Sequence, residues 1–186
     1  MRIDHIAYRV SDRHKTVKFF EEALGYKVAD EFEINFDDGS SAKCFALEPP
    51  ESNRISGNVK TYGLYHLAPE IFVSDGTPDS VVGKWVEERN GIGGIHHIAY
   101  CVDSVADTMK EWGDRGYAEF TTADPLECPG LTQCFTKPSQ ITGVIYEFIE
   151  RDDNAKGFCK DNVKDCLLYT SPSPRDRTRS RMPSSA

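Results

Sequence analysis

The tetrapeptide His5-Ile6-Ala7-Tyr8 returns as His97-Ile98-Ala99-Tyr100, and this repeat decides the fold. The similarity extends further along the chain, because Gly25-Tyr26 is matched by Gly116-Tyr117 with a slip of a single residue. Self-similarity over such a long period indicates two copies of one structural unit. Each copy therefore carries one histidine at the same place in its opening segment.

The first copy predicts a strand, a helix and three further strands. Residues 3–10 are apolar and β-branched enough for a strand, and Ser11-Asp12 supplies N-cap chemistry for the helix that follows. Gly25 stands where a glycine commonly ends a helix. The next strands are expected near 27–34, 42–47 and 64–74.

The second copy repeats this order. Its elements are expected as a strand at 95–102, a helix that carries Val105, Met109 and Trp112, and strands near 117–121, 132–136 and 143–150. Between the copies, residues 78–90 predict a linking helix. The sequence thus predicts an α+β fold of two tandem βαβββ modules in one domain at 1–151, with module one at 1–75 and module two at 94–151.

Composition limits the partners of the chain. A net charge of -8 and a pI near 5.1 disfavour nucleic acid and anionic membranes, which both attract clustered Lys and Arg. No apolar run approaches the roughly 20 residues of a membrane helix. The six cysteines form no Cys-x-x-Cys pair, so we expect thiols in a reducing compartment, and a cytoplasmic protein.

Two segments fall outside the periodic pattern. Glu48–Gly57 is rich in turn-forming residues and predicts a surface loop that lies over a site. Residues 152–186 are a C-terminal extension, and within it 167–186 alternates Ser, Pro and Arg in the composition of a disordered chain. Because 167–186 also looks like a translated sequencing adapter, we set it aside from functional argument.

The repeated strands place two histidines on equivalent faces. Side chains alternate across a strand, so His5 shares a face with Arg9, and His97 shares a face with Cys101. Two imidazoles at matching places can converge on a pseudo-twofold axis. The same alternation predicts that His96 points the other way and packs against a helix.

Two glutamates complete a candidate metal site. Glu70 and Glu147 lie in the last predicted strand of each copy, where an unpaired carboxylate among apolar residues would cost several kcal/mol. Two histidines and two glutamates suit a divalent ion, namely zinc, nickel, cobalt, manganese or iron. We therefore predict a site of His5, Glu70, His97 and Glu147, with His66 as an alternative to Glu70.

The duplicated His-Ile-Ala-Tyr strands and the glutamate-bearing last strand resemble the vicinal oxygen chelate superfamily. The resemblance covers residues 1–151. It implies a cupped half-barrel in which His5, Glu70, His97 and Glu147 hold the metal. It also implies a soluble enzyme that acts on a small molecule, and a homodimer is expected in this superfamily.

Within the superfamily, the chain resembles both glyoxalase I and methylmalonyl-CoA epimerase. The opening His5-Ile-Ala-Tyr-Arg9 is similar to glyoxalase I, whereas Gly143-Val-Ile-Tyr-Glu147 looks more like the epimerase. The resemblance implies a metal-dependent lyase or isomerase that moves a proton next to a metal-held carbonyl, with Glu147 and Glu70 as the catalytic carboxylates. Arg9 and Ser74 would contact an anionic thioester or hemithioacetal.

Two other activities remain open. Two histidines and one glutamate also satisfy the requirement of an Fe(II)-dependent dioxygenase of the ring-cleaving or 4-hydroxyphenylpyruvate type. A metal-free drug-binding protein of the same fold is the alternative from a different functional class. It would leave the four ligand positions free to vary.

Overall fold

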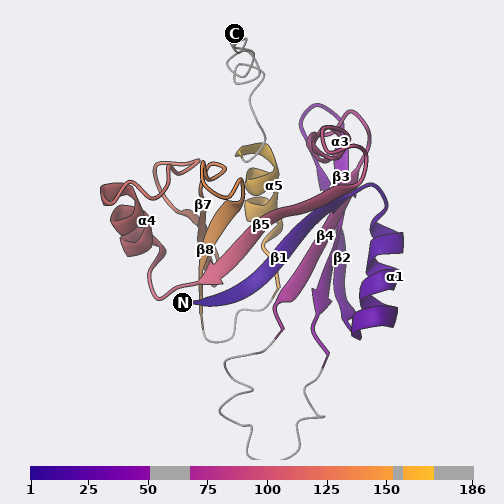
Figure 1. Cartoon of the computed structure of the whole chain (residues 1–186), viewed down its shortest axis with the longest axis horizontal. Coiled ribbons are helices and arrows are strands. Elements are labelled where there is room, and N and C mark those ends of the chain that lie inside the picture. Colours follow the sequence, from indigo (N-terminus) through magenta and orange to yellow (C-terminus); the bar gives the residue numbers. More distant parts are fainter. Residues whose placement is uncertain (51–67, 153–156, 170–186) are drawn as a thin grey trace, which may run out of the picture.

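A single curled sheet of eight strands carries the fold, and each module supplies four of them (Figure 1). The computed structural model describes residues 1–50, 68–152 and 157–169. Module one contributes β1 (Arg2–Val10), β2 (Lys27–Asn35), β3 (Ser41–Glu48) and β4 (Glu70–Gly76). Module two contributes β5 (Gly93–Cys101), β6 (Leu126–Cys128), β7 (Leu131–Phe135) and β8 (Ile145–Arg151).

The strand order β2-β3-β4-β1-β5-β8-β7-β6 confirms the predicted duplication. The two opening strands, β1 and β5, pair antiparallel at the centre of the sheet. On either side, β4 runs parallel to β1 and β8 runs parallel to β5. The two modules are therefore related by a pseudo-twofold axis between β1 and β5, and the first and last strands of both lie around it.

Four helices flank the sheet in the described part of the chain: α1 (Arg13–Leu24), α3 (Val81–Glu87), α4 (Val105–Asp114) and α5 (Lys160–Tyr169). The predicted signals begin and end α1, because Asp12 accepts a hydrogen bond from the Lys15 amide and Gly25 adopts a φ of 75°. Ser80 caps α3 in the same way and Ser104 caps α4. None of these helices is long and apolar enough to span a membrane.

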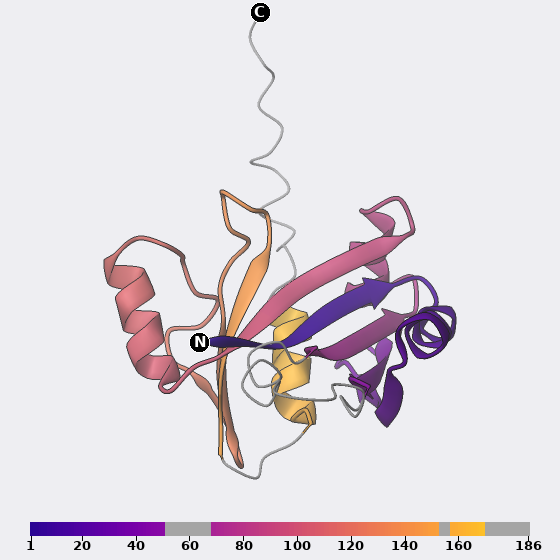
Figure 2. The same cartoon turned by 60° about the horizontal axis from the view of Figure 1, so that its bottom comes forward.

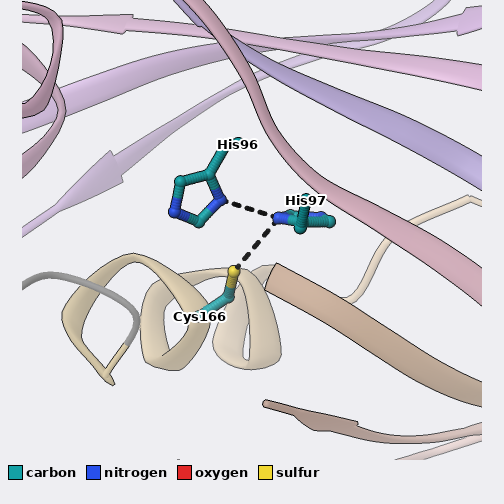
Figure 3. Close-up of side chains that lie close together, drawn as sticks. All are labelled: His96, His97 and Cys166. Carbon is teal, nitrogen blue, oxygen red and sulfur yellow. Dashed lines mark hydrogen bonds between the residues drawn. The ribbon is translucent and has the colours of Figure 1, made fainter. Parts of the chain in front are cut away.

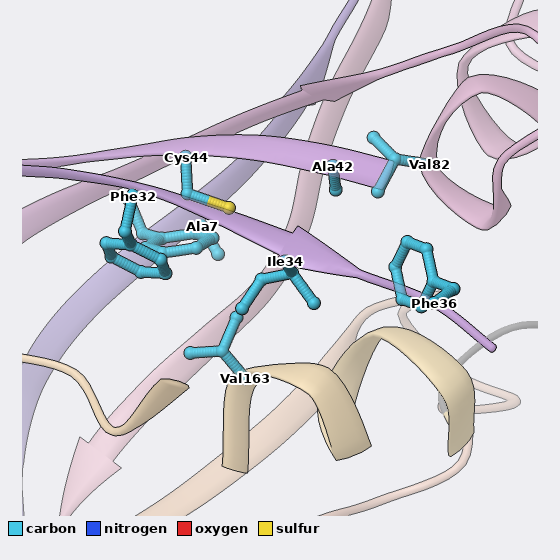
Figure 4. Close-up of a cluster of buried hydrophobic side chains, with 9 residues drawn as sticks. Ala7, Phe32, Ile34, Phe36, Ala42, Cys44, Val82 and Val163 are labelled. Atoms are coloured by element: carbon cyan, nitrogen blue, oxygen red, sulfur yellow. The ribbon is translucent and has the colours of Figure 1, made fainter. Parts of the chain in front are cut away.

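The core is divided between the two faces of the sheet. On the convex face, Val17 and Phe20 of α1 pack over module one, and Trp112 of α4 packs on Phe148 over module two. On the concave face, Phe32, Ile34 and other buried residues of module one meet Val163 of α5 (Figure 4). Burial of these side chains holds α5 in the hollow between the two halves of the sheet, as Figure 2 shows.

Two predictions differ from the structure, and a third concerns residues that mostly lie outside its described part. The strand expected near 117–121 is wrong, because only Phe120 forms an isolated bridge, to Thr136, and the short β6 takes its place beside β7. The expectation of six thiols is also wrong, since Cys128 and Cys159 form a disulfide. The cysteine spacing did not predict this pair, because 31 residues separate the two cysteines and no short motif joins them. Most of the predicted loop at 48–57, and His66, lie outside the described residues.

The C-terminal helix was not predicted. It begins at Lys160, and it reaches Tyr169, so it takes in the first three residues of the segment that we set aside. Val163 and Cys166 of α5 are buried against the concave face. The extension after β8 therefore belongs to the wall of the central hollow.

Candidate metal centre

Three of the four predicted ligands meet at the centre of the concave face. His5 projects from β1, His97 from β5 and Glu147 from β8, and each is no more than 5% exposed. The Nε2 atom of His5 lies 3.3 Å from Nε2 of His97 and 3.1 Å from Oε2 of Glu147. The third separation, between Oε2 of Glu147 and Nε2 of His97, is 3.2 Å. Three potential ligand atoms thus form a nearly equilateral triangle.

This triangle has the size that a single metal ion requires. Nitrogen and oxygen ligands about 2.1 Å from one ion lie about 3.0 Å apart in octahedral and about 3.4 Å apart in tetrahedral geometry. The three observed separations fall between these values. The donor set of two imidazoles and one carboxylate therefore fits a divalent ion without movement of the backbone.

His5 is held from behind by a carboxylate. Its Nδ1 lies 2.9 Å from Oδ1 of Asp4, and Arg151 donates from Nε to Asp4 Oδ2 at 2.9 Å and from Nη2 to Oδ1 at 2.8 Å. Burial raises the pKa of Asp4, but the hydrogen bonds from His5 and Arg151 outweigh it and bring the pKa below its usual range. An ionised Asp4 favours a proton on Nδ1, which directs Nε2 of His5 to the metal position.

His97 is held by a different set of groups. Its Nδ1 lies 2.8 Å from Nδ1 of His96 and 3.9 Å from Sγ of Cys166 (Figure 3). Burial lowers the pKa of His96 well below its usual value, and the nearby Arg9 charge adds to this effect. A neutral His96 can accept the Nδ1 proton of His97, which leaves Nε2 of His97 available as a ligand.

The prediction that His96 faces away from His97 is wrong. The pairing of β1 with β5 shifts register at this point, because Ala7 lies opposite His97 while Tyr8 lies opposite Ile95. A β-bulge of this kind places two consecutive side chains on one face of a strand. His96 therefore lines the pocket, although it also packs against a helix as expected, edge-on to Trp85 of α3.

Glu70 stays apart from the triangle. Its Cα is paired in register with that of His5, and it shares the concave face with Phe72 and Ser74 of β4. Among the described residues, the groups whose ligand atoms lie within 4.8 Å of one another include His5, His97 and Glu147 but not Glu70. Burial raises the pKa of this half-buried carboxyl group.

The triangle forms part of a pocket with a mixed lining. Its polar residues beyond the ligands include Arg9, Ser74 and Gln133, and its apolar residues include Phe72, Phe135 and Phe158. Arg9 is only 1% exposed, and burial lowers its pKa to about 10, so the guanidinium stays charged. Ser74 donates to the backbone oxygen of Tyr8 at 3.3 Å. Both predicted substrate contacts therefore line the pocket.

The segment that leads into α5 covers the site. The ring of Phe158 lies edge-on to His5, with 4.8 Å between centroids, and 4.9 Å from Phe72. The sequence pattern did not predict a role for Phe158, Gln133, Asp4 or Arg151. The Asp-His dipeptide at the start of β1 was the one available signal, because a carboxylate beside a ligand histidine commonly orients it. The others come from distant parts of the chain.

Comparison with known proteins agrees with this architecture. The sequence model of the Glyoxalase/Bleomycin resistance protein/Dioxygenase superfamily matches residues 4–135. No curated protein matches the chain.

Solved structures resemble the fold at low sequence identity. Hypothetical protein BH1468 from Bacillus halodurans C-125 is 23% identical, with 84% of this chain and 98% of that chain covered and a TM-score of 0.60. A 4-hydroxymandelate synthase mutant from Streptomyces coelicolor is 18% identical, with 96% and 54% covered and a TM-score of 0.70. Methylmalonyl-CoA epimerase from Mycobacterium tuberculosis is 21% identical, with 81% and 88% covered and a TM-score of 0.59.

Proposed function

The chain belongs to the Glyoxalase/Bleomycin resistance protein/Dioxygenase superfamily, and from this premise we propose that it is an iron-dependent dioxygenase that acts on a small aromatic carboxylic acid. The observation that carries the proposal is the set of three ligands, His5, His97 and Glu147, from which Glu70 stands apart. Two histidines and one carboxylate on one face of a metal are typical of Fe(II) oxygenases, which keep the remaining positions open.

The chain's own residues fill the other roles. His5, His97 and Glu147 would hold the ion, and the chemistry that ferrous iron supplies in such a set is the joint activation of oxygen and a chelating substrate. Arg9 brings a buried positive charge into the pocket, where it can pair with a substrate carboxylate. Phe72, Phe135 and Phe158 offer ring faces and edges to an apolar substrate body.

Enclosure of the site favours a small substrate. Phe158 and α5 lie over the ligands, so an acid that fits between them and the sheet is better accommodated than a long CoA thioester. The 4-hydroxymandelate synthase offers an analogy, because its name specifies an aromatic hydroxy acid as product and the match extends over 96% of this chain.

Proton transfer of the glyoxalase or epimerase type is the second candidate. It is favoured by Glu70, a half-buried carboxyl group on the concave face whose pKa is raised by burial toward the range of a general base. In this mechanism Glu70 and Glu147 divide the removal and return of a proton on an anionic thioester or hemithioacetal. Glu147 is less suited to this role, because His5 and His97 lower its pKa to about 2 and make it a weak base.

The deciding experiment starts with metal content and oxygen uptake. Protein loaded anaerobically with Fe²⁺ is mixed with oxygen and 4-hydroxyphenylpyruvate as probe, and wild type is compared with His5→Ala and with His14→Ala as the matched control. We expect bound iron and oxygen uptake in wild type and His14→Ala, and neither in His5→Ala.

Other outcomes would redirect the assignment. Bound metal without oxygen uptake, together with solvent-deuterium exchange into methylmalonyl-CoA or the methylglyoxal–glutathione hemithioacetal, would favour the proton-transfer enzyme. Equal and negligible metal binding by wild type and His5→Ala would overturn both activities in favour of a metal-free binding protein.

A further inference from the structure

Arg151, the last residue of β8, makes contacts that join three separate parts of the chain. Its Nε and Nη2 atoms donate to both carboxylate oxygens of Asp4, at 2.9 and 2.8 Å. Its Nη1 atom donates to the backbone oxygen of Gly157 at 2.7 Å. The guanidinium side chain is only 12% exposed, and that of Asp4 is 7% exposed. One side chain thus reaches the start of β1 and the segment that precedes α5.

Both ends of this connection lead to His5. On one side, Asp4 lies 2.9 Å from Nδ1 of His5. On the other side, Gly157 is followed directly by Phe158, whose ring lies edge-on to the His5 ring at 4.8 Å. Arg151 therefore takes part in fixing the imidazole from behind, and in fixing the aromatic ring that covers it.

We propose that Arg151 is a positioning residue that couples the C-terminal helix to the metal site. Through Asp4 it orients His5 as a ligand, and through Gly157 it keeps Phe158 and α5 over that ligand. The inference rests on the proposed function for its metal readout only. The coupling between Asp4 and α5 is a property of the protein without metal.

The guanidinium is the one cationic group suited to this task. It presents several N–H donors in a fixed planar fork, so it can hold a carboxylate with two bonds and still donate to a third acceptor. A lysine has a compact ammonium group that keeps the charge but lacks the fork. Arg151→Lys therefore separates the two functions, because it keeps a cation beside Asp4 and loses the simultaneous hold on Gly157.

The chain provides a matched control. Arg13 also forms an ion pair with an aspartate, at 3.1 Å to Asp75, and its side chain is likewise 12% exposed. This pair joins the start of α1 to β4, whereas the three ligands lie on β1, β5 and β8. Arg13→Gln removes an ion pair of similar burial, so it reports the purely structural cost of such a loss.

Two measurements test the proposal on the full chain. The first is hydrogen exchange of the α5 amides at 160–166 without metal, in wild type, Arg151→Gln, Asp4→Asn, Arg151→Lys and Arg13→Gln. We expect exchange to be about tenfold faster in the first three variants, because a charge-assisted anchor of α5 is lost or misplaced, and unchanged in Arg13→Gln. Exchange of the β1 and β5 amides serves as the check that each variant is folded.

The second measurement is the Co²⁺ affinity of the same proteins by chelator competition. We expect about 10- to 100-fold weaker binding in Arg151→Gln and Asp4→Asn, recovery in Arg151→Lys, and wild-type affinity in Arg13→Gln. Wild-type α5 exchange in Arg151→Gln, or Co²⁺ binding as tight as in Arg13→Gln, would overturn the coupling. If wild type itself binds no Co²⁺, the proposed function fails. Hydrogen exchange of α5 in Asp4→Asn and Arg151→Gln then still decides whether Arg151 couples Asp4 to α5.

Discussion

Metal binding should be strongly dependent on pH, because the metal-free site holds a proton where the ion would bind. Burial lowers the pKa of His5, but the charge of Glu147 and the hydrogen bonds to Asp4 and Glu147 outweigh this and raise the pKa to about 9. Burial raises the pKa of Glu147, yet His5 and His97 lower it to about 2. At neutral pH the metal-free site is therefore an imidazolium paired with a carboxylate.

The size of the effect follows from the pKa of His5. A ligand histidine must be neutral, so the ion displaces one proton from His5. Between pH 7 and a pKa of about 9, this displacement costs about 3 kcal/mol, or about 100-fold in affinity. The apparent affinity should rise about tenfold per pH unit, and more steeply where His97, whose pKa is also raised, releases a second proton.

The assay is Co²⁺ affinity by chelator competition from about pH 6 to about pH 8.5, together with calorimetry in two buffers of different ionisation enthalpy to count released protons. We expect at least one proton per ion at pH 7. Glu147→Gln removes the main group that raises the pKa of His5. We therefore expect this variant to bind Co²⁺ more weakly and with an affinity that depends less on pH, compared with the exposed control Glu127→Gln. An affinity independent of pH, with no proton release in wild type, would refute the reasoning.

Three further outcomes are expected. The His5–Glu147 pair should stabilise the metal-free protein most between pH 4.5 and pH 6.5. The contribution of His5 is complete below pH 6.5 and is lost as pH rises through about 9, whereas that of Glu147 is present above pH 4.5 and is lost as pH falls through about 2. Thermal unfolding measured across this pH range checks the prediction, and a stability maximum at alkaline pH would contradict it. Cys159→Ser should lower the free energy of unfolding by about 3 kcal/mol, because it removes the Cys128–Cys159 disulfide. Cys101→Ser, which removes a free thiol, is the control, and equal denaturation midpoints in the two variants would count against a stabilising disulfide. Arg9→Met should raise the KM for a carboxylate probe about 100-fold while Arg2→Gln leaves it unchanged; an unaltered KM in Arg9→Met would remove Arg9 from substrate binding.

The repeat allowed much of the fold and site to be predicted, because both depend on local pattern. Alternation along β1 and β5 placed His5 and His97 on the concave face, and duplication identified the last strands as the source of carboxylates. Glu147 lies with the histidines as that logic requires. Glu70 does not, although its backbone is in register with His5, since pairing of Cα atoms does not fix where a long side chain ends.

The remaining features depend on contacts that no local pattern encodes. His96 is turned into the pocket by a register shift between β1 and β5, and strict alternation cannot predict such a shift. Asp4 and Arg151 are separated by 147 residues, and Cys128 and Cys159 by 31. Asp4 and Arg151 meet because β1 and β8 both neighbour β5 in the sheet. Cys159 reaches Cys128 only through the extension after β8, whose composition gave no reason to expect a folded segment.

Duplication makes the ligand positions equivalent, but the supporting groups make the two halves of the centre unequal. Module two supplies His97 and Glu147, whereas module one supplies His5 alone. His5 is backed by an ionised Asp4, which raises the basicity of an imidazole, while His97 is backed by a neutral His96. His5 should therefore be the stronger of the two nitrogen ligands. Glu70 of β4 does not reach the ligands, and module one carries Arg9 and Ser74 in the pocket lining, so the anionic group of the substrate is expected on the side of module one.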